Sequence, residues 1–116
     1  MRIGTDITVV SRIEKSIQKF GDKFIDRFLN KSEKQLAKKI ESIAGFWAAK
    51  EAISKALGCG IGAELHFHDI TIYKDEKNAP YFQLSAKAQN LHQIKESSLS
   101  IAHDGGFAIA TVIINN

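Results

Sequence analysis

Apolar residues recur with a helical period in residues 42–58, which read SIAGFWAAKEAISKALG. At about 100° per residue, the large apolar side chains gather on one side of such a helix and alanines cover much of the rest. The stretch is rich in helix-forming residues, and Gly58 suits the position just after a helix ends. A helix that is apolar on nearly all sides is usually buried. The pattern therefore predicts a buried central helix.

Two charged residues, Glu51 and Lys55, occupy the one polar slot of this helix, and Lys50 and Ser54 lie close by in the sequence. An exposed Glu–Lys pair four residues apart is common and stabilises a helix by only about 0.2–0.5 kcal/mol. A charge on a buried helix must instead be paired, bound to a metal or neutralised. The narrow slot favours a functional role, although this spacing identifies no reaction.

Residues 2–10 alternate in the manner of a strand. One face carries Ile3, Thr5, Ile7 and Val9, and the other carries Gly4, Asp6, Thr8 and Val10. Aspartate is depleted in strands, so Asp6 either accepts backbone hydrogen bonds at a strand end or has a functional role. Gly4 has no side chain, and we expect space for a ligand beside it.

Helices are predicted for residues 11–41, with breaks near Gly21 and Asn30. Ser11 followed by Glu14 fits a capping box at the start of the first helix. Between positions 12 and 39 there are nine Lys or Arg and four Asp or Glu residues. Such a run is either an ordinary solvated face or a docking patch for an acidic macromolecule.

The second half of the chain predicts two hairpins. One spans residues 67–84, and Asp104-Gly105-Gly106 is the turn of the other. Ser85 is expected to cap a short helix over 86–94, with His92 at its surface. The order of elements predicts one α+β domain over residues 1–116, with a small, mostly antiparallel sheet packed on the long central helix.

Composition narrows the class of protein. With 116 residues, of which 44% are hydrophobic and 25% charged, the chain has room for one core. The net charge of +3 suits an acidic partner or a phosphorylated ligand. The single Cys59 forms no internal disulfide, and no zinc-like spacing of cysteine and histidine is present. We find no signal-peptide core and no membrane span, and we expect a cytoplasmic location.

A bound cation would explain why one carboxylate lies within a strand and another on a buried helix. If Asp6 and Glu51 come together in the fold, they provide the hard oxygen ligands that Mg²⁺ prefers, with substrate phosphates completing its coordination. Lys50, Lys55 and a charged histidine at the sheet rim would neutralise further phosphate charge. This combination points to phosphoryl-type chemistry on a phosphate-rich substrate.

Three ordered motifs then identify a resemblance. IGTDI at 3–7, FWAAKEAISKALG at 46–58 and SIAH at 100–103 resemble the signature motifs of holo-acyl-carrier-protein synthases, the small bacterial type of 4′-phosphopantetheinyl transferase. Residues 69–80 also resemble the strand–turn–strand of that family, and the match runs from residue 3 to about 114. The departures are Phe46-Trp47 in place of Arg-Phe, Asn78-Ala79 in place of Gly-Lys, and Ala102 in place of Ser or Thr.

The resemblance implies transfer of the phosphopantetheine arm of coenzyme A to a serine of apo-acyl carrier protein, releasing adenosine 3′,5′-bisphosphate. Asp6 and Glu51 would bind Mg²⁺, and Lys55 would bind phosphate and protonate the leaving group. The resemblance leaves open whether Glu51 or a water at the metal accepts the serine proton. The implied coenzyme A contacts are Lys50, Ser54, Lys55, Gly58, Pro80 and His103; the implied carrier-docking residues are Arg12, Lys23 and Arg27. The family fold assembles as a trimer with sites at subunit interfaces.

One alternative from another class is a non-enzymatic basic α+β module that binds nucleic acid or an acidic protein. It explains the charge but leaves Asp6 and Glu51 without a role. The chain also lacks an aromatic RNA-binding platform and a recognition helix. We therefore expect neither nucleic acid nor membrane among the partners.

Overall fold

The computed structural model describes residues 1–116. Its elements, in chain order, are β1 (Arg2–Val9), α1 (Val10–Phe20), α2 (Asp22–Asp26), α3 (Lys31–Leu36), α4 (Ile40–Ala56), the 3₁₀ helix η1 (Phe67–Asp69), β2 (Ile70–Lys74), β3 (Pro80–Leu84), α5 (Ala86–His92), β4 (Glu96–Asp104) and β5 (Phe107–Asn115). The strands form two antiparallel sheets, one of three strands in the order β1-β5-β4 and one made of β2 and β3. The predicted α+β class is confirmed, although the strands divide between two sheets.

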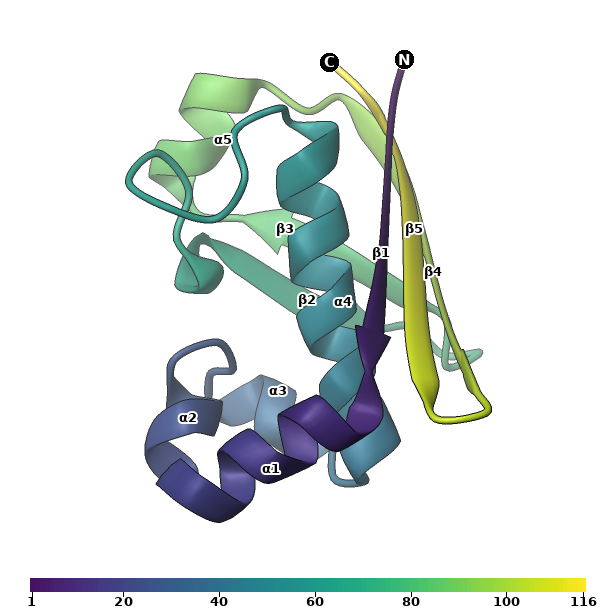
Figure 1. Cartoon of the computed structure of the whole chain (residues 1–116). Coiled ribbons are helices and arrows are strands. Elements are labelled where there is room, and N and C mark those ends of the chain that lie inside the picture. Colours follow the sequence, from purple (N-terminus) through teal and green to yellow (C-terminus); the bar gives the residue numbers. More distant parts are fainter.

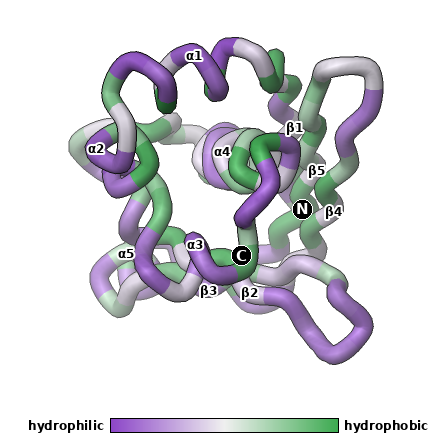
Figure 2. The backbone as a smooth tube through the Cα atoms, turned by 90° about the horizontal axis from the view of Figure 1, so that it is seen from below, coloured by the Kyte–Doolittle hydropathy of each residue, from purple (hydrophilic) through white to green (hydrophobic).

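The predicted central helix is α4, around which the other elements are arranged. The three-stranded sheet runs along one side of α4, and α1, α2 and α3 gather near its N-terminal end (Figure 1). A view along α4 shows the helices, the β2–β3 hairpin and the three-stranded sheet surrounding it (Figure 2). Eleven of its 17 residues are buried, and they include Lys50 and Ser54. Burial on nearly all sides is thus confirmed.

The face of β1 that carries Gly4, Asp6 and Thr8 packs toward α4. A Cβ atom added to Gly4 would lie 2.9 Å from the backbone nitrogen of Ala56 and closer still to the carbonyl oxygen of Ala52. The expectation of ligand space beside Gly4 is wrong, because the backbone of α4 fills that space. Glycine is needed here so that strand and helix can approach closely.

The opposite face of β1 is exposed and carries mostly apolar side chains. The register places Ile3 opposite Ile113 and Ile7 opposite Ile109. All four isoleucines are at least 40% exposed, and Ile3 reaches 67%. The Thr5–Thr111 pair lies between the two isoleucine pairs, and a group of exposed apolar side chains of this kind often marks an interaction site.

Two local predictions fail for identifiable reasons. The capping box at Ser11 does not form, because α1 begins at Val10, directly after β1, and the Val10 N–H donates to the carbonyl of Gly106 at 2.9 Å. A capping box forms instead at α3, where the Asn30 side chain accepts from the Glu33 N–H and Glu33 accepts from the Asn30 N–H, both at 2.9 Å. Residues 67–69, expected in a strand, form η1.

None of the helices combines the length and the hydrophobicity that a membrane span requires.

Candidate functional site

A cavity of about 580 Å³ opens where β1, α1 and α4 meet. Its lining residues are Asp6, Ile7, Thr8, Arg12, Ile13, Lys15, Ser16, Phe24, Trp47 and Glu51. Asp6 comes from the middle of β1 and Glu51 from the middle of α4, 45 positions later in the chain. The fold therefore brings Asp6 and Glu51, the two carboxylates at positions unusual for a charge, to the wall of one cavity.

Asp6 is held by two side chains. The Lys55 ammonium donates to Asp6 Oδ1 at 2.7 Å and to the Thr5 carbonyl at 3.2 Å. The Thr8 hydroxyl donates to Asp6 Oδ2 at 2.8 Å. The Asp6 side chain is only 14% exposed, whereas that of Lys55 is 52% exposed. Asp6 is thus fixed in position, and its charge is met by a cation that can move away into solvent.

Glu51 experiences the charge of Asp6 directly. Burial raises the pKa of the Glu51 carboxyl above its ordinary value, and the negative charge of Asp6 raises it further, while Lys55 acts in the opposite direction. The two carboxylates are therefore close enough to repel each other in a partly desolvated place. Two hard oxygen donors at one cavity, with the half-exposed Lys55 as the cation that acts on both, fit Mg²⁺.

Lys50 does not face this cavity, and the expectation that it holds a phosphate is wrong. Its side chain is fully buried, and its ammonium donates to the Phe28 carbonyl at 2.6 Å, to Glu33 Oε1 at 3.0 Å and to the Phe67 carbonyl at 3.2 Å. The three donors of the ammonium are all used. Burial lowers the pKa of Lys50, and the adjacent Glu33 carboxylate opposes that shift.

The expected contact of Ser54 with coenzyme A is also contradicted. Ser54 is fully buried, and its hydroxyl donates to the Glu51 carbonyl at 2.7 Å within α4. Gly58 follows the helix with φ of +80°, as expected of a glycine at a helix C-terminus, and it does not line the cavity.

Two further expected contacts, Pro80 and His103, also lie outside the cavity in the single chain. Pro80 begins β3 and pairs with Lys74. His103 lies near the end of β4 and lines a separate pocket of about 360 Å³ beside the Gly105–Gly106 turn. The chain by itself therefore brings together the expected metal ligands and Lys55, but not the other expected coenzyme A contacts.

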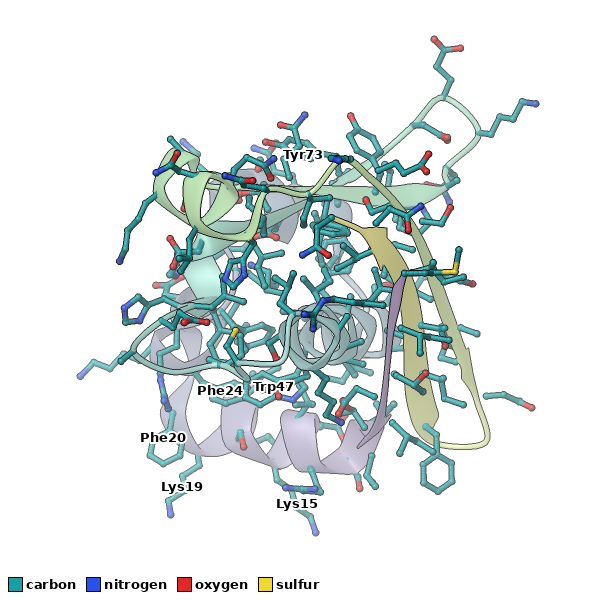
Figure 3. All side chains as sticks on the ribbon, turned by 90° about the horizontal axis from the view of Figure 1, so that it is seen from above. Lys15, Lys19, Phe20, Phe24, Trp47 and Tyr73 are labelled. Carbon is teal, nitrogen blue, oxygen red and sulfur yellow. The ribbon has the colours of Figure 1, made fainter.

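The expected docking residues lie beside the cavity or on the neighbouring helix. Arg12 lines the cavity from α1, while Lys23 lies on α2 and Arg27 directly follows it. All three are exposed, and none has a carboxylate within 4.0 Å. Figure 3 shows Lys15 and Lys19 along the outer edge of α1, with Phe24 and Trp47 on the inner side. This surface offers unpaired positive charge.

The whole chain resembles known proteins. The model of the 4′-phosphopantetheinyl transferase superfamily matches residues 2–112. The chain belongs to this superfamily. The family recognised in the sequence motifs is thereby confirmed.

Relatives match nearly end to end. A holo-[acyl-carrier-protein] synthase of Sulfurovum sp. is 57% identical over 115 residues, which cover 99% of this chain and 97% of the relative. That of Campylobacter fetus is 56% identical over 98% of this chain and 99% of its own length. The crystal structure of the Helicobacter pylori holo-[acyl-carrier-protein] synthase in complex with coenzyme A superimposes with a TM-score of 0.95, at 53% identity, over 97% of this chain and 99% of that one.

Thr8 also lines the Asp6–Glu51 cavity, although no sequence motif singled it out. The signal was present, because Thr8 and Asp6 lie two positions apart and so share a strand face. The hydroxyl orients Asp6 and leaves Oδ1 to its cationic partner.

The Phe46-Trp47 departure from the family motif also has a structural explanation. Phe46 is only 2% exposed and belongs to the core, so it cannot contact a phosphate. Trp47 stacks on Phe24, with ring centroids 5.7 Å apart, and lines the cavity. Positive charge reaches the cavity from α1 instead, through Arg12 and Lys15.

Proposed function

We propose that this protein transfers the 4′-phosphopantetheine moiety of coenzyme A to a serine hydroxyl of apo-acyl carrier protein, with Mg²⁺ as cofactor. The products are holo-acyl carrier protein and adenosine 3′,5′-bisphosphate. The observation that carries the proposal is the meeting of Asp6 and Glu51 at one cavity in a chain of this superfamily. Relatives named holo-[acyl-carrier-protein] synthase over nearly their full length support it.

Asp6 and Glu51 would hold the Mg²⁺ ion. When bound, the ion supplies Lewis-acid stabilisation of charge on the diphosphate of coenzyme A. Thr8 keeps Asp6 oriented through its hydrogen bond to Oδ2. The Lys55 ammonium now contacts Asp6 Oδ1, and a cation is therefore already favoured at this carboxylate. These features fit a divalent ion better than an apolar ligand.

Lys55 would have two tasks in the transfer. Its exposed ammonium can leave Asp6 and bind a phosphate oxygen of coenzyme A. The serine oxygen of the carrier protein forms a bond to the phosphorus of the phosphopantetheine phosphate as the bond to the bridging diphosphate oxygen breaks. Lys55 donates a proton to that departing oxygen, and the serine proton passes to a base for which Glu51 is our candidate.

Coenzyme A is the expected co-substrate. The Helicobacter pylori structure is described as a complex with coenzyme A, and that protein shares this fold at 53% identity. We keep Lys55, Gly58, Pro80 and His103 as contacts for coenzyme A. Because Pro80 and His103 lie outside the Asp6 cavity in one chain, the site is completed by a neighbouring copy.

We propose a homotrimer for this reason. The exposed outer face of β1 and β5 supports the assembly, since it displays four isoleucines, Ile3, Ile7, Ile109 and Ile113, to solvent. Burying such a face is strongly favourable, at roughly 25 cal/mol per Å² of apolar surface.

Arg12, Lys23 and Arg27 are the proposed contacts for the acidic carrier protein. Arg12 lines the cavity, and Lys23 and Arg27 carry exposed positive charge on and just after the neighbouring α2, so that together they would steer the carrier serine toward coenzyme A. We place this reaction in the cytoplasm, in keeping with the free thiol of Cys59.

The direct test is to incubate purified protein with coenzyme A, Mg²⁺ and an apo-acyl carrier protein and to measure the intact mass of the carrier. A mass gain of one phosphopantetheine group, abolished by Glu51→Gln, is the expected result. An unmodified carrier, together with salt-sensitive RNA binding, would support the non-enzymatic basic module instead.

A further inference from the structure

A second cluster of metal-ligating side chains lies away from the Asp6–Glu51 cavity. Cys59 follows α4, Glu64 lies in the irregular segment after it, and His92 is the last residue of α5. The Cys59 sulfur, a Glu64 carboxylate oxygen and a His92 ring nitrogen all lie within 4.8 Å of one another. None of these residues lines the Asp6–Glu51 cavity.

The His92 side chain is the decisive observation. It is only 9% exposed, so the expectation of a surface histidine is wrong. Its Nε2 atom is buried and has no hydrogen-bond partner. The nearest carboxylate oxygen, Glu64 Oε2, is 3.8 Å away, which is beyond hydrogen-bond distance. An unpartnered buried ring nitrogen is costly, and here it is aimed at a thiol and a carboxylate.

We propose that Cys59, Glu64 and His92 form a binding site for one thiophilic divalent cation, with Zn²⁺ as the best match. Zn²⁺ prefers thiolate sulfur, imidazole nitrogen and carboxylate oxygen, at about 2.0–2.3 Å. Ligand atoms on a tetrahedron of that size lie roughly 3.3–3.8 Å apart, so the cluster needs only a small contraction. Three protein ligands leave the fourth position to water. Mg²⁺ does not suit this donor set, because it selects oxygen ligands.

The ion would join two parts of the chain that are otherwise weakly connected. The segment from Cys59 to Glu64 has no helix or strand of its own. The Cys59 and Gly60 N–H groups both donate hydrogen bonds to the Ser54 carbonyl, near the end of α4. Glu64 is half exposed and free to move toward the ion, whereas His92 is held in α5. A metal here would fasten the loop that follows α4 onto α5, independently of the transfer reaction.

Co²⁺ spectroscopy on the full chain tests the site, because Cys59 is the only cysteine. Chelator-treated protein titrated with Co²⁺ should develop a thiolate-to-cobalt charge-transfer band that added Zn²⁺ removes. Cys59→Ser and His92→Gln should each abolish the band. Glu51→Gln is the matched control, since it alters the other proposed metal site and should leave the band intact. Absence of the band in the unmodified protein, or its persistence in His92→Gln, would overturn the proposal.

A second measurement needs no substituted protein. Zn²⁺ should slow alkylation of Cys59 by iodoacetamide and raise the melting temperature of the unmodified chain, whereas Mg²⁺ should do neither through this site. An alkylation rate that Zn²⁺ does not change would contradict the assignment, whatever the outcome of the transferase assay.

Discussion

The ammonium of Lys55 lies 2.7 Å from Oδ1 of Asp6, although the two residues are 49 positions apart in the chain. The contact joins helix α4 to strand β1. This ion pair is asymmetric, because the aspartate is largely buried and held by Thr8 while the lysine is half exposed. A long, flexible cation therefore neutralises a fixed anion. The arrangement suits a site where the lysine exchanges its partner once a metal and a phosphate enter.

The Glu51 carboxyl should titrate above its ordinary value of 4.5 in the metal-free protein, because burial and the Asp6 charge both disfavour its ionised form. Asp6→Asn removes one of these causes and should lower the pKa of Glu51. Since protons and Mg²⁺ compete for the same carboxylate, Mg²⁺ affinity should fall as the pH drops through that pKa. NMR titration of ¹³C-labelled glutamate measures the shift. A Glu51 pKa that is unchanged in Asp6→Asn would show that the two carboxylates do not interact.

Replacing Lys50 should cost stability rather than coenzyme A affinity. Lys50→Met leaves the Glu33 carboxylate buried without its cation, which should lower the free energy of unfolding by about 3–5 kcal/mol. The double variant Lys50→Met/Glu33→Gln carries no buried charge here and should recover part of the loss. Urea denaturation gives these values. A stable Lys50→Met protein with a raised KM for coenzyme A would instead restore the phosphate-binding role.

Arg12→Glu should weaken productive encounter with the carrier protein. The change reverses an exposed, unpaired charge beside the cavity, and we expect KM for the carrier to rise about tenfold or more while the fold is unaffected. Lys95→Glu makes the same charge change at an exposed position just before β4 and is the matched control. Steady-state kinetics at several salt concentrations measure the difference. Equal effects of the two substitutions would argue against a localised docking surface.

Ile7→Asp should dissociate the proposed homotrimer. Ile7 is 61% exposed and lies opposite Ile109, so a charge there is tolerated in the single chain but disfavoured at an apolar interface. Leu91→Asp, at a 56% exposed position on α5, is the control. Light scattering should give a monomer mass for Ile7→Asp alone, with transfer activity lost. An unchanged mass would place the subunit interface elsewhere.

Periodicity was sufficient for the parts of the fold that depend on local pattern. The helical repeat located α4, the alternation located β1, and the Asp104-Gly105-Gly106 turn signal located the β4–β5 hairpin. Asp6 and Glu51 stood out because a carboxylate conflicts with a strand interior and with a buried helix. Lys55 stood out because a charged ammonium group is also unusual on a buried helix.

The errors concern side chains whose partners are distant in sequence. Lys50 neighbours Glu51 in the chain, yet its ammonium is held away from the cavity by Glu33 and two backbone carbonyls. Gly4 suggested open space, but whether a ligand or a helix occupies such space depends on tertiary packing. His92 was expected at the surface because the segment that covers it lies almost thirty residues earlier, beyond the reach of any local pattern.

The proposed transfer depends on one divalent ion shared by Asp6 and Glu51, and calorimetric titration of Mn²⁺ into the protein–coenzyme A complex tests for that ion most directly. We expect one strong site per chain that excess Mg²⁺ displaces. Asp6→Asn and Glu51→Gln should each abolish it, and the double variant should be no worse than either single one, because both remove the same site. Strong one-site binding that survives in Asp6→Asn or in Glu51→Gln would contradict the shared ion.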